Sequence, residues 1–220
     1  MINLKISDKI REACPEIRMG LIKAEVKVNA SSDILLKEID DYCIVLNNEL
    51  KLEELAAYTE IKDGREVYKK LGKSPSKYRL SSEALIRRIL QGKGLYRVNN
   101  IVDINNLISI KSKCPVGSYD IQNIKGDMVL CRAGDGEKYK GIGKELLNIE
   151  HLPVLADKEG SFGSPTSDSE RAMVKDSSKE IIMCIYCFSR DNNLDDYLNE
   201  AGELLEKYAE GKNFEIDIIR

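Results

Sequence analysis

The chain has 220 residues, and its 34 Lys and Arg against 37 Asp and Glu give a formal net charge of −3. That length is ample for one hydrophobic core, and the charge balance argues against non-specific coating of nucleic acid, which requires a basic face. No apolar run approaches the ~18 residues of a membrane-spanning helix, and the start MINLKISDKI matches neither a signal nor a transit peptide. We therefore expect a cytoplasmic protein with no membrane partner and no role on DNA.

Residues that often hold metals are few or badly spaced. There are six cysteines and one histidine, His151, so a multi-histidine metal site is excluded within one chain. Cys184 and Cys187 have redox or zinc spacing, but they lie in the apolar run IIMCIYCF, which is typical of a buried strand. Residues three apart on a strand point to opposite faces, so this pair is expected to be structural and reduced. We predict no metal and no cofactor, and a structural role for His151.

The first half of the chain is predicted to be mainly helical. A β-branched, loosely alternating strand spans 16–28, and an amphipathic helix spans 31–58 with Ser32 as its N-cap. A short helix over 65–73 and another over 81–94 follow. The next helix is expected to begin with Asn100 as N-cap, which places Asp103 where its carboxylate reaches the free N–H groups of the first turn.

The second half is predicted to be mainly strands. Two β-like runs flank Asp135 and Gly136, a hairpin signal, and a short strand spans 151–157. The Gly-, Ser- and Pro-rich stretch 158–171 is long for a connection inside a compact domain, which indicates a mobile or functional loop. A central strand over 179–188, a helix over 194–211 and a last strand over 213–219 complete the prediction.

This order of elements, without regular βαβ alternation, predicts an α+β fold. We expect one domain over 1–220, with an N-terminal helix and strand layer over 1–75 and a core with the pocket over 76–220. Generic catalytic motifs are weak, since GIG at 141–143 lacks the third glycine of a dinucleotide fingerprint. The segment SDSERAMVKDSSKE (167–180) gathers hydroxyls, carboxylates and Arg171, and is either a solvated turn or part of a site.

One long stretch carries a family resemblance. Residues 78–133 contain the patterns G-L-x-x-x-N-x-x-V-D-x-x-N, P-x-x-x-[FY]-D and [EK]-G-D-x-V-x-R in order and at matching spacing. The stretch resembles the B3/B4 domain, the editing module of the β subunit of bacterial phenylalanyl-tRNA synthetase, and is most similar to its freestanding single-domain relatives. The matching positions are Gly94, Leu95, Asn99, Val102, Asp103, Asn106, Pro115, Tyr119, Asp120, Gly126, Asp127, Val129 and Arg132.

The resemblance implies a mixed or antiparallel sheet core with helices packed around it. It also implies a pocket that, in the synthetase, admits tyrosine misattached to phenylalanine tRNA and hydrolyses the aminoacyl ester. An activated ester requires only a positioned water and a stabilised oxyanion. Backbone N–H groups, hydroxyls and the vicinal ribose hydroxyl supply these without a metal or a catalytic triad.

The chain departs from the synthetase pattern at two positions. Gly117 stands where synthetase versions carry a histidine, and Ser177 stands where they carry the glutamate thought to read the tyrosine hydroxyl. The pocket is therefore expected to serve another amino acid, or only to bind. Glu170 and Arg171 are candidates for a replacement polar pair, and an arginine there could hold a carboxylate or phosphate through two hydrogen bonds.

Two functions stay open at this point. The first is a trans-acting aminoacyl-tRNA deacylase with Glu170 as its acid/base, and the second is a non-catalytic module that binds RNA or a small metabolite. The expected substrate-binding residues are Asn106, Gly117, Asp120, Ser169, Arg171, Ser177 and Ser178. The expected contacts to the tRNA backbone, unless they form only a solvated helix face, are Arg87, Arg88, Lys93, Arg97, Lys111 and Lys113.

Overall fold

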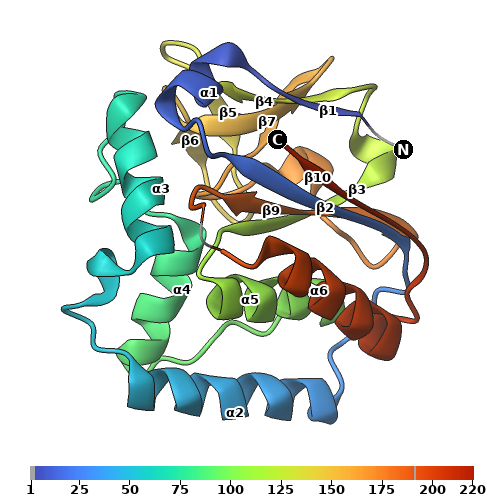
Figure 1. Ribbon diagram of the computed structural model, residues 1–220. Helices are drawn as coiled ribbons and strands as arrows, with labels where there is room; N and C mark the ends of the chain where they lie inside the picture. The colour runs from blue at the N-terminus through green and yellow to red at the C-terminus, as the bar shows by residue number, and fades with distance from the viewer. Residues whose placement is uncertain (1–2, 191) are drawn as a thin grey trace.

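The computed structural model describes residues 3–190 and 192–220. Its centre is an antiparallel sheet in the order β10-β2-β9-β3 (Figure 1). The strands are β10 (Lys212–Ile219), β2 (Arg18–Glu25), β9 (Glu180–Cys187) and β3 (Val116–Asp120). β2 lies between β10 and β9, so the N-terminal segment supplies an inner strand of this sheet.

A second sheet lies against one face of the first and has the order β1-β4-β7-β8 (Figure 1). Its strands are β1 (Leu4–Ile6), β4 (Met128–Arg132), β7 (Pro153–Asp157) and β8 (Gly160–Gly163). β1 runs parallel to β4, and the other pairs are antiparallel. A small hairpin of β5 (Lys138–Lys140) and β6 (Leu146–Asn148) completes the strands.

Helices cover the opposite face of the first sheet. α5 (Asn100–Ser112) and α6 (Leu194–Ala209) lie directly on it, with α2 (Asp33–Glu49) beneath them (Figure 1). α3 (Thr59–Lys70) and α4 (Ser81–Leu90) stand at one end of the sheet, and the short α1 (Asp8–Ala13) precedes β2. No helix in residues 3–190 and 192–220 has the length and apolar character needed to cross a membrane.

The burial of β9 follows from its central position, because it is covered on both faces. Gly20 of β2 faces α6, since a Cβ atom there would lie 2.9 Å from Leu194 Cδ1, and it pairs with Ile185 of β9. Side chains alternate along a strand, so Ile185 and Cys187 face the helices while Cys184 and Tyr186 face the second sheet. Cys184 and Cys187 therefore point to opposite faces, as predicted.

The predicted fold class and most predicted elements are confirmed. Ser32 caps α2, because its side chain accepts a hydrogen bond from the Leu35 N–H. The predicted cap of α5 is wrong by one residue, since Asn99 accepts from the Val102 N–H and is the N-cap. Asp103 still reaches back along the chain, where its carboxylate accepts from the Val98 N–H at 3.1 Å.

Three other predictions of local structure are wrong. The runs on either side of Asp135 and Gly136 do not pair with each other, because β4 pairs with β1 and β7 while β5 pairs with β6. The stretch 158–171 is not one loop, since it contains β8 and a 3-10 turn, η3 (Glu170–Ala172). The predicted first helix also ends earlier, at Glu49.

Candidate functional site

The candidate site is built around β3, where Gly117 lies beneath the ring of Tyr119. A Cβ atom on Gly117 would lie 2.2 Å from the phenol oxygen of Tyr119, and one on Gly163 of β8 would lie 2.3 Å from the same atom. The ring is fully buried and meets Phe162 edge to face, with centroids 5.1 Å apart. Tyr119 therefore fills the space above both glycines, between the two sheets.

The carboxylate of the half-buried Asp168 lies at the end of this ring. The Tyr119 hydroxyl donates to Asp168 Oδ1 at 2.9 Å, and the same oxygen accepts from the Ser164 N–H at 3.0 Å. The Tyr186 hydroxyl lies 3.0 Å from that of Tyr119. Burial raises the pKa of the Asp168 carboxyl to about 6, although both hydrogen bonds oppose the shift. Carboxyls with such raised pKa values are concentrated at functional sites, so Asp168 joins the candidate residues, although sequence reasoning missed it.

Two further tyrosines hold the loop that carries Asp168. The Tyr139 hydroxyl of β5 donates to the Ser167 carbonyl oxygen and lies 3.2 Å from Ser164 Oγ. The Tyr68 hydroxyl of α3 lies 2.8 Å from Thr166 Oγ1. Elements far apart in the sequence thus fix this loop from several sides, which keeps the Asp168 carboxylate in place.

Asp120 and Ser178 meet at one end of β3. The Ser178 hydroxyl donates to Asp120 Oδ2 at 2.6 Å, and both residues are buried. Asp120 Oδ1 accepts from the Gln122 N–H at 3.0 Å and so caps η2 (Ile121–Asn123). The neighbouring Ser177 is exposed. This pair connects β3 to the turn before β9, and it is the one close pair among the predicted substrate-binding side chains in the described chain.

Arg171 is engaged by the protein itself. Its guanidinium forms two hydrogen bonds with the Asp157 carboxylate, at 2.9 and 3.0 Å, and donates to the carbonyl oxygens of Asn123 and Gly160. The Asp157 side chain is fully buried. Burial alone would raise the pKa of Asp157, but the Arg171 and backbone hydrogen bonds outweigh it and lower that pKa. Arg171 therefore anchors the segment between β8 and β9, and both of its Nη groups are engaged by protein oxygens.

Glu170 and Ser169 lie on the same turn with different surroundings. The Ser169 hydroxyl caps η3 by accepting from the Arg171 N–H at 3.2 Å. Glu170 is one-third exposed, and Lys140 Nζ lies 3.0 Å from its carboxylate. The turn runs beside β3, because Tyr119 forms an isolated bridge with Met173. Phe162, Asp168 and Tyr186 each contact Tyr119, and these four residues are called the Tyr119 cluster below. Glu170 lies at the rim of this cluster rather than inside it.

Asn106 is half-buried on α5, and the amide that makes hydrogen bonds to β3 is that of its neighbour, Asn105. Asn105 is buried, donates to the Val116 carbonyl at 3.1 Å and accepts from the Ser118 hydroxyl at 3.0 Å. Val116 and Ser118 both belong to β3, so Asn105 connects α5 to the strand of the site. Sequence reasoning selected the neighbouring amide because the family pattern ends there.

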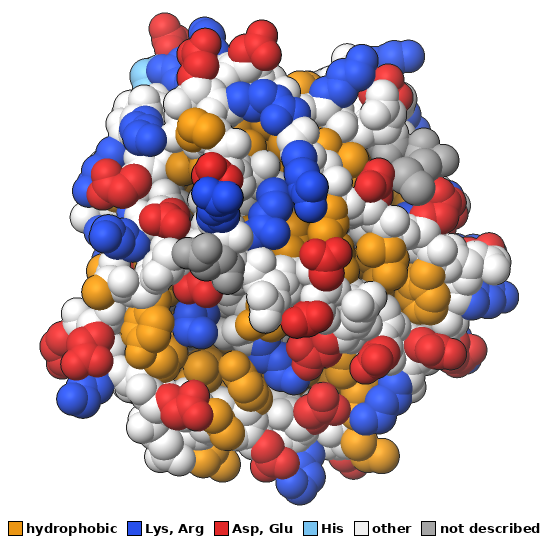
Figure 2. Space-filling model, in the orientation of Figure 1, with side chains coloured by type: hydrophobic (Ala, Val, Ile, Leu, Met, Phe, Trp, Pro, Cys, Tyr) orange, Lys and Arg blue, Asp and Glu red, His pale blue; other side chains and the backbone are white. Residues whose placement is uncertain are grey.

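The predicted RNA-contacting cations are mostly paired with protein groups. Arg87 Nε donates to the buried Glu83 at 2.9 Å, and the guanidinium of Arg88 lies 4.0 Å from the ring centroid of Tyr96. Arg97 pairs with Asp40, and Lys111 with Glu200. Lys113 lies 5.7 Å from the Tyr58 ring centroid. Lys93 is exposed and makes no ion pair with any described residue, and Figure 2 shows acidic and basic side chains interspersed over the face in view.

Two other features lie away from β3. A cavity of about 740 Å³ lies between α1, the end of α3 and β4, and touches none of the predicted site residues. Asp135, Glu150 and His151 form a group with metal-binding side-chain types, and His151 Nε2 lies 2.7 Å from Asp135 Oδ1. Both features are at the surface, and neither contacts the Tyr119 cluster.

Comparison with known proteins identifies the family. The family described as the B3/4 domain matches residues 63–209, well over half of the chain. The chain belongs to the B3/4 domain family. The family resemblance of the sequence motifs is thereby confirmed, and every predicted substrate-binding residue of this B3/4 domain lies inside the matched segment.

The similar curated proteins are phenylalanine–tRNA ligase β subunits. The B3/4 chain is 28% identical to that of Aquifex aeolicus over 109 residues, which are 46% of this chain and 13% of that protein. It is 29% identical to that of Symbiobacterium thermophilum over 107 residues, which are 47% of this chain and 12% of that protein. It is 35% identical to the β subunit of Wolbachia over 69 residues, which are 31% of this chain and 9% of that protein. The matches thus span only a small part of these relatives.

A similar solved structure is an N-terminal fragment of the phenylalanyl-tRNA synthetase β subunit from Pyrococcus horikoshii. The TM-score is 0.48 at 12% sequence identity, with 97% of this chain and 50% of that chain covered.

Proposed function

We propose that this B3/4 domain protein binds tRNA and hydrolyses the ester of mischarged aminoacyl-tRNA in trans. The observation that carries the proposal is the family match over 63–209, which contains both the β3 strand and the η3 turn. The similar curated proteins are named as ligases that act on tRNA.

The arrangement around η3 is compatible with that chemistry. Glu170 is accessible at the rim, so its carboxylate can reach a water molecule beside a bound ester, whereas the Asp168 carboxylate already accepts from the Tyr119 hydroxyl and the Ser164 N–H. An aminoacyl ester is an activated bond, and a positioned water with an acid/base contributes about 10²–10⁴-fold to its hydrolysis. In this proposal Glu170 activates the water, and the Lys140 ammonium 3.0 Å away holds the carboxylate in place.

A second function, binding without catalysis, is favoured by the position of Tyr119. Its ring occupies the space above Gly117, the position where the synthetase pattern has a histidine. A ligand that entered between the sheets at this point would have to displace a buried, hydrogen-bonded tyrosine. In this alternative the domain holds RNA or a small metabolite at its surface.

Deacylation of a panel of radiolabelled aminoacyl-tRNAs, correctly charged and mischarged, separates the two functions. The deacylase proposal predicts selective release of one amino acid, with Glu170→Gln at least about 10² slower and tRNA binding unchanged. Asp176→Asn is the matched control, because Asp176 is an exposed acid in the turn before β9. Absence of release across the panel, with measurable tRNA binding, would favour the non-catalytic function.

The tRNA contact is tested at the two cations with the fewest protein partners. Lys93→Glu combined with Lys113→Glu should weaken tRNA binding and reduce the magnitude of its salt slope by about two. Lys5→Glu is the matched control, because Lys5 is on β1, which lies across the molecule from α4 and α5 in Figure 1. Equal binding by the double variant and the control would place both cations outside the RNA interface.

A further inference from the structure

Two cysteines from distant parts of the chain face each other where β3 and β9 meet. The register pairs Val116 with Ile185, and the Tyr186 N–H donates to the Pro115 carbonyl at 2.9 Å, which extends the ladder by one residue. The next opposed pair is Cys114 and Cys187. Cys114 lies two residues before β3 begins, and Cys187 is the last residue of β9. Both face the helices and are buried, with Cys114 1% and Cys187 0% exposed.

The hydrogen-bond pattern makes this position suitable for a disulfide. Opposed residues in an antiparallel ladder alternate between hydrogen-bonded and non-hydrogen-bonded pairs, and in the latter the Cα atoms are about 4.5 Å apart. Pro115 and Tyr186 are the hydrogen-bonded pair, so Cys114 and Cys187 form the non-hydrogen-bonded one. Disulfides require Cα atoms roughly 4.4–6.8 Å apart, and the spacing typical of a non-hydrogen-bonded pair falls within that range.

The sulfur of Cys187 has a cation beside it. Arg18 of β2, the strand partner of Cys187, places Nη2 3.4 Å from its sulfur and also donates to the carbonyl oxygens of Ser189 and Asn192. The neighbouring Cys114 thiol and the charge of Arg18 outweigh burial and lower the pKa of Cys187 to about 7, and the Cys187 thiol lies 3.2 Å from the Ser189 carbonyl oxygen.

The other cysteines lack this arrangement. The pKa values of the Cys43, Cys131 and Cys184 thiols are raised, with burial as the main cause. Burial likewise raises the pKa of Cys14 to about 11. The neighbouring Cys187 and burial raise the pKa of the Cys114 thiol.

We propose that Cys114 and Cys187 are a reversible dithiol that closes to an intramolecular disulfide, with Cys187 as the attacking sulfur. With hydrogen peroxide as oxidant, the Cys187 thiolate bonds to one oxygen, the O–O bond breaks, and the hydroxide released takes up a proton as water. The Cys114 sulfur then attacks the sulfenic sulfur of Cys187, the S–O bond breaks, and a second water leaves with the Cys114 proton. Two thiols are oxidised and one peroxide is reduced to two waters.

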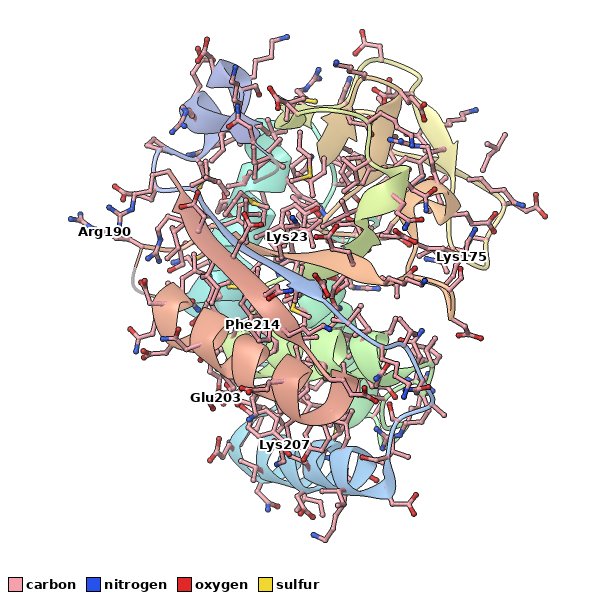
Figure 3. All side chains as sticks on the ribbon, turned by 90° about the vertical axis from the view of Figure 1, so that its right-hand side faces the viewer. Lys23, Lys175, Arg190, Glu203, Lys207 and Phe214 are labelled. Atoms are coloured by element: carbon pink, nitrogen blue, oxygen red, sulfur yellow. The ribbon has the colours of Figure 1, made fainter. Side chains whose placement is uncertain are left out.

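The bond would tie the start of β3 to the end of β9. Figure 3 shows Lys175 and Arg190 at opposite ends of β9, and the cysteine pair lies toward the Arg190 end. The Asp120–Ser178 hydrogen bond already holds the other end of β3. The oxidised form would therefore have β3, which carries Gly117 and Tyr119, fixed to the central strand at both ends.

The test uses the full chain, fully reduced and then treated with hydrogen peroxide. Thiols are counted with a maleimide after denaturation, and linked peptides are mapped by mass spectrometry without reductant. We expect two of the six thiols to be lost, one linked peptide pair joining Cys114 to Cys187, complete reversal by dithiothreitol, and a higher Tm for the oxidised form.

Variants assign the roles of the two sulfurs. Cys114→Ser should form no disulfide and should accumulate a Cys187 sulfenic acid that dimedone traps, whereas Cys187→Ser should show neither product. Cys43→Ser is the matched control, because Cys43 is buried on α2 away from the pair, and it should behave as the unaltered chain does. Six remaining thiols, or a linked peptide that lacks Cys114 or Cys187, would overturn the proposal, and neither outcome depends on a variant folding.

Discussion

The phenol oxygen of Tyr119 lies 2.2 Å from the point that a Cβ atom on Gly117 would occupy. The two residues are separated by one position on β3, so their side chains share a face. Gly117 is therefore required for space and not for an unusual backbone conformation, since it is not among the residues with positive φ. The ring of one residue fills the volume that the other leaves empty.

Gly117→Ala should destabilise the protein, because the new methyl group must displace a buried ring. Overpacking of this kind costs about 1–3 kcal/mol, measured as the free energy of unfolding in urea. Gly134→Ala is the matched control, since its Cβ atom would meet its nearest neighbour at 3.6 Å, an ordinary contact. In combination with Tyr119→Val the Gly117→Ala substitution should cost less than it does alone. Equal costs for the two alanine variants would show that Tyr119 does not occupy this space.

The raised pKa of Asp168 predicts a specific pH dependence of stability. Its folded pKa of about 6 lies above the ordinary aspartate value of 3.8, so between about pH 4 and 6 the folded state holds a proton that the unfolded state has lost. The contribution of this group is fully favourable below pH 4 and is lost as the pH rises through 6. The change amounts to at most about 3 kcal/mol.

Asp168→Asn removes this titration while keeping an oxygen that accepts from Tyr119 and Ser164. We expect the difference in unfolding free energy between the variant and the unaltered chain to shift in favour of the variant from pH 4 to pH 7. Urea titrations at several pH values measure it, and taking the difference cancels the acids whose pKa values are lowered, such as Asp157 and Glu150. A difference independent of pH would mean that the pKa of Asp168 is the same in the folded and the unfolded protein.

The sequence predicts local features well and the long-range contacts of this site poorly. Ser32 is the predicted N-cap of α2 and does cap it, through the N–H of Leu35 three residues along the chain. Asp168 was missed because the groups that enclose it, Tyr119 and Tyr186, lie elsewhere in the chain, and no periodicity reports such a contact. Glu170 was selected instead, since a family pattern specifies positions along the chain and not burial.

The errors in secondary structure have the same origin. An Asp-Gly pair predicts a turn, and the turn is present. The partners of β4 are nevertheless β1 and β7, and β1 lies at the N-terminal end of the chain, more than a hundred residues before β4. The Gly- and Ser-rich composition of 158–171 concealed β8, which is short and depends on β7 for its hydrogen bonds. Strand pairing is decided by the whole fold, whereas the helix cap at Ser32 is decided by its nearest residues.

Arg171 is predicted to stabilise the protein and not to bind a ligand. Arg171→Ala would leave the fully buried Asp157 carboxylate without its ion-pair partner, at a cost of about 3–5 kcal/mol in the free energy of unfolding. Arg79→Ala is the matched control, because Arg79 is exposed, and it should change stability by less than about 0.5 kcal/mol. Similar stabilities for the two variants would free Arg171 for the ligand role that its sequence position suggested.

Arg87 and Lys93 are predicted to behave differently although both lie on the proposed RNA face. The side chain of Glu83 is fully buried between the guanidinium groups of Arg65 and Arg87, at 3.0 and 2.9 Å. Arg87→Glu would place a second carboxylate against it and should cost about 3 kcal/mol or more of unfolding free energy, whereas Lys93→Glu should leave stability unchanged. Thermal melts and tRNA binding are measured on the same samples, so that loss of binding in the Arg87 variant is not confused with loss of fold. If the Tm of the Arg87→Glu variant equals that of the unaltered chain, the ion pairs around Glu83 do not stabilise the fold. Arg87 can then be tested directly as an RNA contact.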